Sequence, residues 1–305
     1  MQNTFKISLD KISMVYKIGW NAHIVNLEAF DIKMMDDGYS LKQEFESARY
    51  GAYQYNYTYV DGKNPEGVIY IGFYRNDPVK TKRYVKIEYN PNKAELPRPI
   101  INLLYGLECV LEKIQSVDIA FDFDGLTCDD YRVRTRGDTM VYSSGVARTF
   151  YVRPKGEGRV KIYDKTKERA KLGIEIPQTL RIEITVKDPY FFCIQNIREG
   201  DILYAQQYVK YLSEISVRRR TAVLPSVDVD NPKEKYNEVI LYLLNNVDVV
   251  TAQKAIGMMS VNHRTKYRRL MEHSEFEPID INEITFIEVV SSMIRKVVPI
   301  WKFNL

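Results

Sequence analysis

The chain has 305 residues, of which 45% are hydrophobic and 28% are charged, and this composition excludes the disordered and membrane-spanning classes. No apolar run approaches the roughly 20 residues of a membrane-spanning helix, and the N-terminus lacks a signal-peptide core, so we expect a cytoplasmic protein with no membrane partner. Three scattered cysteines, at 109, 128 and 193, favour neither a disulfide framework nor a thiolate zinc site. The net charge of +4 is compatible with nucleic-acid binding but does not by itself argue for it.

The patterning of the chain changes near residue 225. Short alternating segments dominate before this point, and Pro225, Pro232 and the polar stretch 228–231 indicate a break. The stretches 236–246, 249–258 and 283–297 then have helical spacing. We therefore predict an α+β fold with a first domain, 1–225, built on an antiparallel sheet with one polar face and helices on the other, followed by a mostly helical C-terminal part, 226–305.

Four alternating segments place polar side chains on one face of a strand, because residues i, i+2 and i+4 of a strand share a face. The segments are 85–89, 117–123, 160–165 and 181–185. The ordinary interpretation of each is the solvated face of an antiparallel sheet. Taken together, the four polar faces carry Lys86 and Glu88; Asp118 and Asp122; Lys161, Tyr163 and Lys165; and Arg181, Glu183 and Thr185.

If these strands are neighbours, their polar face holds a carboxylate cluster beside a tyrosine flanked by cations. Carboxylates on a rigid sheet suit Mg²⁺ or Mn²⁺, and the candidate ligands are Asp118, Glu183, Asp122 and Glu88. Which of them bind stays open, because a strand carboxylate can instead pair with Lys86 or Arg181.

The tyrosine of this face, Tyr163, is the candidate nucleophile. Its hydroxyl needs nearby cations to lower the cost of the phenolate, and Lys161 and Lys165 are spaced to supply them. Attack on a phosphodiester would release a 3′-hydroxyl and leave a 5′-phosphotyrosine, which keeps the bond energy for a later joining step.

Other catalytic constellations are poorly supported. The three histidines, His23, His263 and His273, all lie outside the four strands, which argues against a Ser-His-Asp or Cys-His centre. The chain has neither a phosphate-binding glycine loop nor a dinucleotide fingerprint. The paired histidines that usually hold the metal of tyrosine nicking enzymes are also absent, so carboxylates would have to replace them.

The chain resembles the rolling-circle plasmid replication initiators of Gram-positive bacteria, the replication initiation factor family typified by staphylococcal plasmids. The motifs that carry the resemblance are 86–93, 117–123, 159–169, 180–187 and 264–267, so it extends from about residue 84 nearly to the end. It implies that Tyr163 is the nucleophile and that Asp118, Asp122 and Glu183 occupy matching positions. Our candidate catalytic residues are Tyr163, Lys165, Lys161 and Arg181.

The hairpin before the catalytic strand departs from the family pattern, because the stretch 150–158 lacks the glycine turn and the serine usual there. Tyr151 is therefore a secondary candidate nucleophile, and Tyr142 is treated in the same way. For both, an ordinary packing role is the competing interpretation.

The resemblance also implies that the C-terminal part recognises the origin. The segment 263–269 is basic with an aromatic residue inside, and a solvated helix face is the alternative interpretation. Lys and Arg side chains would pair with phosphates, while one or two arginines could bind guanine edges. The candidate DNA contacts are Arg264, Lys266, Tyr267, Arg268 and Arg269, with a second run at Arg218, Arg219 and Arg220.

We therefore expect a metal-dependent, origin-specific nicking and joining enzyme that opens one strand of plasmid origin DNA at the single-stranded loop of a hairpin. The alternatives are a conjugative relaxase of a mobile element and a DNA-binding regulator on the same fold that has lost cleavage. A homodimer and a host helicase partner are implied by the resemblance alone.

Overall fold

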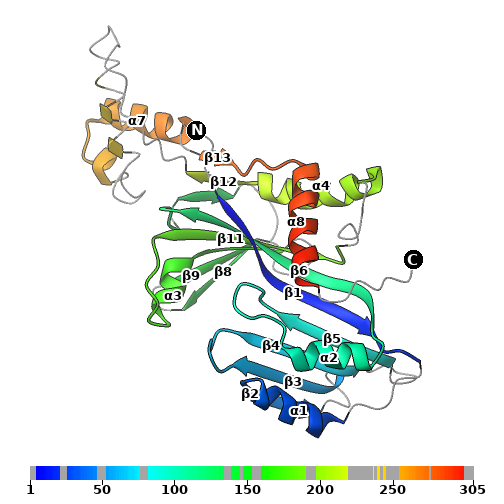
Figure 1. Ribbon diagram of the computed structural model, residues 1–305. Helices are drawn as coiled ribbons and strands as arrows, with labels where there is room; N and C mark the ends of the chain where they lie inside the picture. Colours follow the sequence, from blue (N-terminus) through cyan, green and yellow to red (C-terminus); the bar gives the residue numbers. More distant parts are fainter. Residues whose placement is uncertain are drawn as a thin grey trace. The chain divides into compact units, whose positions relative to one another are not determined.

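The computed structural model describes residues 5–20, 26–46, 53–75, 82–128, 130–133, 139–144, 147–152, 159–189, 197–218, 236, 239–240, 243–244, 254–274 and 276–298. It has an α+β fold with a large antiparallel sheet, which confirms the predicted fold class (Figure 1). Among the described residues, no helix is both long enough and apolar enough to cross a membrane.

The chain divides into two compact units that do not follow the predicted boundary at residue 225. The first unit combines Met1–Ile7, Phe121–Ile184 and Leu203–Glu283, and the second combines Ser8–Ala120, Thr185–Ile202 and Ile284–Leu305. Two long strands, β6 (Val110–Asp124) and β11 (Thr179–Lys187), contribute residues to both units. Segments from both sides of residue 225 therefore belong to each unit.

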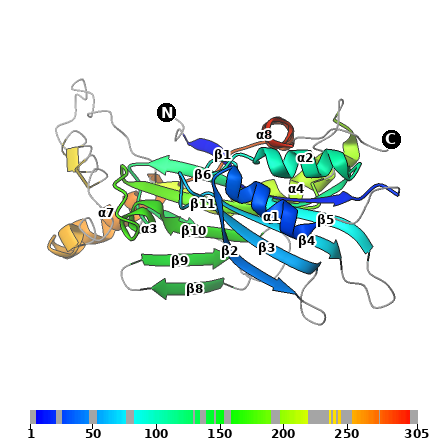
Figure 2. The same cartoon turned by 60° about the horizontal axis from the view of Figure 1, so that its bottom comes forward.

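The second unit is built on a run of neighbouring antiparallel strands. In spatial order these are β2 (Tyr39–Glu46), β3 (Tyr53–Asp61), β4 (Val68–Arg75), β5 (Lys82–Tyr89) and β1 (Lys6–Lys17), followed by β6. Its helices are α1 (Leu27–Asp36), α2 (Arg98–Gly106) and α8 (Glu283–Val297). Figure 2 shows these helices over the same side of the strands.

The helices of this unit cover the apolar face of its sheet. Ile71 and Phe73 of β4 and Ile87 of β5 are fully buried. Phe30 of α1 packs against this face, with its ring centroid 5.9 Å from that of Phe73. The hydroxyl of Tyr89 donates to the main-chain oxygen of Val297 at the end of α8. Burial of this face therefore holds the helices on one side, and the polar residues of the same strands lie on the other.

A helix cap and two glycine turns determine where α1 begins and how the chain passes from α1 into β2. Asn26 caps α1 by accepting a hydrogen bond from the main-chain nitrogen of Ala29 at 3.0 Å. Gly38, with φ of +90°, turns the chain from α1 into β2. A Cβ at Gly62 would lie 2.7 Å from the main-chain oxygen of Gly38, so the close approach of these two turns requires glycine at position 62.

The first unit contains the strands that carry the candidate nucleophile. The order is β6, β11, β10 (Val160–Asp164), β9 (Ala147–Val152) and β8 (Thr139–Ser144), and β11, β10, β9 and β8 pair with their neighbours in this series in antiparallel fashion. The apolar face of these strands is buried at Phe121, Ile162 and Ile182. Phe5 packs edge-on against Phe121, with ring centroids 5.6 Å apart.

The first unit also contains a short helix, a small second sheet, helix α7 (Val261–Ser274) and most of helix α4 (Glu199–Ser213). Helix α3 (Lys165–Ala170) follows β10 directly. A separate three-stranded sheet has the order β13 (Phe276–Pro278), β12 (Ile215–Arg218) and β7 (Tyr131–Val133). Helix α4 precedes β12, and α7 precedes β13.

Candidate functional site

The register of β10 against β11 brings the predicted polar residues together. Lys161 lies directly opposite Glu183, and Tyr163 lies directly opposite Arg181. Directly opposite residues of an antiparallel pair share a face, so all four side chains lie on one side of the sheet. Asp122 of β6 joins them, because Arg181 binds it. The face assignments predicted from the alternation of the sequence are confirmed for these strands.

Tyr163 is held in a buried hydrogen-bonded position. Its side chain is 8% exposed, and its hydroxyl donates a hydrogen bond to Oε1 of Glu183. The other carboxylate oxygen of Glu183 accepts from Nζ of Lys161 at 2.6 Å, and this Nζ lies 5.5 Å from the centroid of the Tyr163 ring. Burial, and then the negative charge of Glu183, raise the pKa of Tyr163 far above its usual value.

Arg181, which lies directly opposite Tyr163, forms a bidentate ion pair with Asp122. Nε of Arg181 lies 2.6 Å from Oδ1 of Asp122, and Nη2 lies 2.7 Å from Oδ2. Lys165 adds a third contact, at 2.9 Å to Oδ2. Burial opposes ionisation of Asp122, but the hydrogen bonds from Arg181 and Lys165 outweigh it and lower the pKa of this carboxyl. Nη1 of Arg181 lies 3.9 Å from Oε1 of Glu183, which links the two halves of the cluster.

We call these six residues the tyrosine cluster: Asp122, Lys161, Tyr163, Lys165, Arg181 and Glu183. All of them lie in the first compact unit. The cluster has three cationic side chains and two carboxylates, so one positive charge remains when all five are ionised. It is therefore suited to accept a phosphate group.

Asp164 supports the cluster, although no role was predicted for it from the sequence. It is 2% exposed, and its Oδ1 accepts from the main-chain nitrogen of Lys167 at 3.0 Å, so it caps α3. Its Oδ2 accepts from Gln178 at 3.2 Å. The cap ends β10 just after Tyr163 and sets the chain direction from which Lys165 reaches Asp122. The available signal was an aspartate directly before a helical run, which is a common N-cap pattern.

The two other predicted carboxylates lie in the second unit. Oδ1 of Asp118 accepts from the hydroxyl of Thr185 at 2.7 Å. Oε1 and Oε2 of Glu88 lie 2.5 Å and 3.2 Å from the Nζ atoms of Lys11 and Lys86. Burial opposes ionisation of Glu88, but the two lysines outweigh it and lower its pKa. Pairing with Lys86, the alternative left open by the sequence, is therefore present.

The donor atoms of the tyrosine cluster do not fit a Mg²⁺ or Mn²⁺ ion. Both oxygens of Glu183 accept hydrogen bonds, from Tyr163 and Lys161, and both oxygens of Asp122 are bound by Arg181 or Lys165. A metal would have to displace these hydrogen-bond donors, whereas Mg²⁺ requires several free oxygen ligands. Among the described residues, no group of three or more His, Cys, Asp or Glu side chains is placed to hold a metal ion.

The two secondary tyrosines extend the same rows of the sheet. Tyr151 of β9 lies directly opposite Lys161 and is partly exposed. Tyr142 of β8 lies opposite Thr149, which in turn lies opposite Tyr163. The side chain of Tyr142 is outside the described residues. Tyr151 therefore shares the polar face of the tyrosine cluster, one strand away from it.

The predicted DNA-binding segment, 263–269, lies within α7. A helical segment at 254–257 is joined to α7 by three residues. The two share a small apolar core made of Leu244, Ile256 and Tyr267, with Met259 packed against it.

The residues predicted to contact DNA have different environments in α7. Lys266 is exposed. Tyr267 is 2% exposed and belongs to the apolar core. Nη2 of Arg264 donates to the main-chain oxygen of Met259 at 3.1 Å, and its Nε is buried with no hydrogen-bond partner among the described residues. We therefore assign Tyr267 and Arg264 to the support of the helix and its turn, and Lys266 to its outer face.

The remaining predicted contacts cannot be placed at the level of side chains. Arg268 and Arg269 lie in α7 and Arg218 ends β12, but their side chains are outside the described residues. Arg219 and Arg220 lie outside the described residues altogether. Their role in binding DNA stays a prediction.

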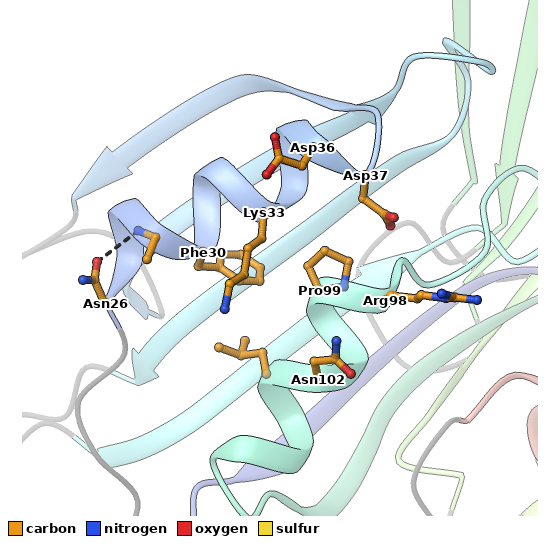
Figure 3. Close-up of a pocket in the computed structure, with 10 residues that line it drawn as sticks. Asn26, Phe30, Lys33, Asp36, Asp37, Arg98, Pro99 and Asn102 are labelled. Atoms are coloured by element: carbon orange, nitrogen blue, oxygen red, sulfur yellow. Dashed lines mark hydrogen bonds between the residues drawn. The ribbon is translucent and has the colours of Figure 1, made fainter.

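A pocket of about 460 Å³ lies between α1 and α2 in the second unit (Figure 3). Phe30 and Leu103 line it together with charged side chains of both signs, among them Lys33, Asp36 and Arg98. None of the residues predicted for the catalytic, metal or DNA-binding sites lines it. No sequence pattern predicted a function for these residues.

No family model matches the chain, and no curated protein matches it in sequence. The resemblance to plasmid replication initiators therefore rests on the sequence motifs alone.

Proposed function

We propose that this chain is an origin-specific enzyme that nicks and rejoins one DNA strand through Tyr163 and so initiates rolling-circle replication. The observation that carries the proposal is the hydrogen bond from the hydroxyl of Tyr163 to Glu183, inside a cluster with a net positive charge. A nucleophile bonded to a base, with the base held by a third group, is the general arrangement of covalent catalysis. Here Lys161 is that third group, at 2.6 Å from Glu183.

In the proposed first step, the oxygen of Tyr163 attacks the scissile phosphorus while its proton passes to Oε1 of Glu183. The bond from phosphorus to the 3′-oxygen breaks, and this oxygen takes up a proton. A 5′-phosphotyrosine and a free 3′-hydroxyl remain. Attack of a 3′-hydroxyl on the phosphotyrosine reverses the chemistry and joins a strand without any other source of energy.

Lys161 is the cation best placed to meet the phosphate. Its side chain is 31% exposed, whereas that of Arg181 is 6% exposed. As the proton of Tyr163 neutralises Glu183, the ammonium group of Lys161 loses its counter-charge and becomes available to the developing negative charge on the phosphate. Fixed charges aimed at developing charge are a major source of catalysis. Arg181 and Lys165 supply the other positive charges of the cluster, and their ion pairs with Asp122 fix the positions of these charges.

The proposed mechanism contains no metal-dependent step, because the donor set of the cluster does not fit one. The family resemblance, by contrast, implies a reaction that depends on Mg²⁺ or Mn²⁺. Chelation of divalent metals should stop nicking if the reaction depends on a metal and should leave it unchanged if it does not. Homodimerisation and a host helicase remain proposals from the resemblance, as does the hairpin loop as substrate.

Origin recognition is the proposed role of α7. Its outer face presents Asn262, Thr265 and Lys266, all exposed, on one side of a helix whose other side is anchored by Tyr267. Side chains on such a face can reach base edges and phosphates when the helix lies in the major groove. The relaxase alternative uses the same chemistry, and only the cognate DNA separates the two.

The proposal is tested on supercoiled DNA carrying the sequence that surrounds the gene for this chain. Wild-type protein should produce open circles and a covalent protein–DNA adduct, and Tyr163→Phe should produce neither. Binding of the same DNA by the variant should change by less than about 1 kcal/mol, since only one hydroxyl is lost. Binding without cleavage by the wild-type protein would instead favour the regulator that has lost cleavage. Cleavage by Tyr163→Phe at the wild-type rate would contradict the assignment of the nucleophile.

A further inference from the structure

The pocket between α1 and α2 takes no part in the proposed strand transfer. Both helices belong to the second unit, and they contact each other there. The volume of the pocket, about 460 Å³, lies within the range of small-molecule sites, roughly 300 to 1000 Å³. Its size therefore suits a small molecule.

The floor of the pocket is apolar and is formed by both helices. Phe30 of α1 lines it together with Pro99 and Leu103 of α2. Phe30 is 4% exposed, and its ring packs edge-on against the ring of Tyr59, with the centroids 6.0 Å apart. Because packing against the sheet fixes this ring, the floor is already formed without a ligand and can accept an aliphatic or aromatic group.

Charged groups of both signs surround the floor. Lys33 and Asp37 lie one helical turn apart on α1, and Figure 3 shows both side chains pointing toward α2, where Asn102 lies. In the part of the chain that the structure describes, these three side chains have no ion-pair partner and no hydrogen bond, although the spacing of Lys33 and Asp37 would allow an ion pair. Asp36 and Arg98 add one charge of each sign, so the charges of the lining sum to zero.

This charge pattern selects among ligand classes. A phosphate or a nucleic-acid backbone would meet two aspartates, and a simple anion or cation would leave one of the two charges of α1 without a partner. A zwitterion satisfies both. The side chains at positions 33 and 37 have Cβ atoms about 5 to 6 Å apart, as neighbours on a helix do. An α-amino acid carries its ammonium and carboxylate groups on one carbon, so both groups can reach this pair at the same time.

We propose that the pocket binds a free L-α-amino acid with an apolar side chain. The carboxylate of the ligand accepts hydrogen bonds from the ammonium of Lys33 and the amide of Asn102, and its ammonium group donates to Asp37. Its side chain packs on Phe30 and Leu103. Three attachments at different points also select one enantiomer. The inference does not depend on the proposed function, because none of these residues belongs to the tyrosine cluster or to α7.

The test is calorimetric titration of the full-length protein, without DNA, with L-leucine, L-methionine and L-phenylalanine as probes. At least one of them should bind at millimolar concentration or below. For a leucine ligand, L-leucinamide lacks the carboxylate and N-acetyl-L-leucine lacks the ammonium group. Each should bind about tenfold or more weakly than L-leucine, the effect expected when a hydrogen bond to a charged group is lost. D-leucine, which has the same charges and the same side chain, should also bind more weakly.

Variants locate the site. Lys33→Met and Asp37→Asn should each weaken binding of the probe about tenfold or more, whereas Lys63→Met, which removes an exposed lysine of the second unit outside the pocket, should bind as wild type does. Thermal unfolding without ligand checks that each variant is folded.

Three results would overturn the inference. They are no binding of any of the three probes at millimolar concentration, binding of N-acetyl-L-leucine or D-leucine as tight as that of L-leucine, and wild-type affinity in both Lys33→Met and Asp37→Asn. None of them bears on Tyr163, because the titration contains no DNA and the pocket contains no residue of the tyrosine cluster.

Discussion

Replacing Glu183 with glutamine tests whether this carboxylate is the proton acceptor of Tyr163. The substitution keeps the shape of the side chain and an oxygen that can accept from the tyrosine hydroxyl, but it removes the charge and the basicity. General-base catalysis contributes about 10²- to 10⁴-fold, or about 3 to 5 kcal/mol of the barrier. We therefore expect Glu183→Gln to nick DNA about 10²- to 10⁴-fold more slowly than wild type at pH 7.

The pH dependence separates this role from a purely structural one. Burial and the negative charge of Glu183 raise the pKa of Tyr163. Removal of the Glu183 charge should therefore lower this pKa and make the phenolate easier to form. Without an internal base, the rate of the variant should follow the phenolate fraction and rise about tenfold per pH unit below the pKa of the tyrosine. The deficit should therefore shrink as the pH rises from 7 to 9.

The assay is single-turnover cleavage of a labelled oligonucleotide containing the mapped nick site, quenched at intervals and resolved on a denaturing gel. Thermal unfolding should be followed in parallel, because Glu183 is 3% exposed and also binds Lys161. Asp122→Asn serves for comparison, because it removes a carboxylate charge of the same cluster. Among the contacts of the described residues, Asp122 binds Arg181 and Lys165 and not the hydroxyl of Tyr163. A Glu183→Gln variant that is folded and as fast as wild type at pH 7, or whose deficit is the same at pH 7 and pH 9, would refute the reasoning.

Four further predictions concern the ion pairs of the tyrosine cluster, the metal and the outer face of α7. Arg181→Met should lower the free energy of unfolding in urea by about 3 kcal/mol, because breaking a buried ion pair costs about 3 to 5 kcal/mol and Lys165 still pairs with Asp122. Lys165→Met should cost less, and an equal or larger loss for Lys165→Met would contradict the prediction. The pKa of Asp122 is lowered in the fold, so its contribution to stability is present at neutral pH and is lost as the pH falls below about 4; the stability difference between wild type and Asp122→Asn should therefore narrow on acidification, and a constant difference would count against the ion pair. Excess EDTA should leave the nicking rate unchanged, and a loss of nicking that added Mn²⁺ restores would show that a metal takes part. Lys266→Ala should weaken DNA binding and reduce the slope of log affinity against log salt by about one, whereas Lys63→Ala, which removes an exposed lysine of the second unit, should not; equal slopes for wild type and Lys266→Ala would remove Lys266 from the interface.

The polar faces of the strands could be predicted because the period of a strand depends only on sequence position. Lys161 and Tyr163, and likewise Arg181 and Glu183, lie on one face as the alternation requires. The partners across the strands could not be predicted, since they depend on register. Alternation alone left Glu183 and Asp122 as candidate metal ligands. In the observed register, Glu183 binds Tyr163 and Lys161, and Asp122 binds Arg181 and Lys165.

Helix α7 shows a second reason why the environment of a side chain can differ from the one predicted from the sequence. An aromatic residue among basic ones resembles a nucleic-acid contact, and the sequence analysis therefore included Tyr267. In α7 the helical period turns its ring toward Leu244 and Ile256, while the neighbouring Lys266 stays exposed. The apolar residues that form this small core are separated in the sequence, so the direction of the ring depends on packing that a local pattern does not contain.

The central claim is that Tyr163 forms the first covalent bond to DNA. The most direct measurement is mass spectrometry of the first adduct, formed with a single oligonucleotide and digested with trypsin and nuclease. The account predicts a nucleotide attached through its 5′-phosphate to the peptide 162–165, which trypsin releases by cutting after Lys161 and Lys165. Attachment to any other peptide in this first step would contradict the account.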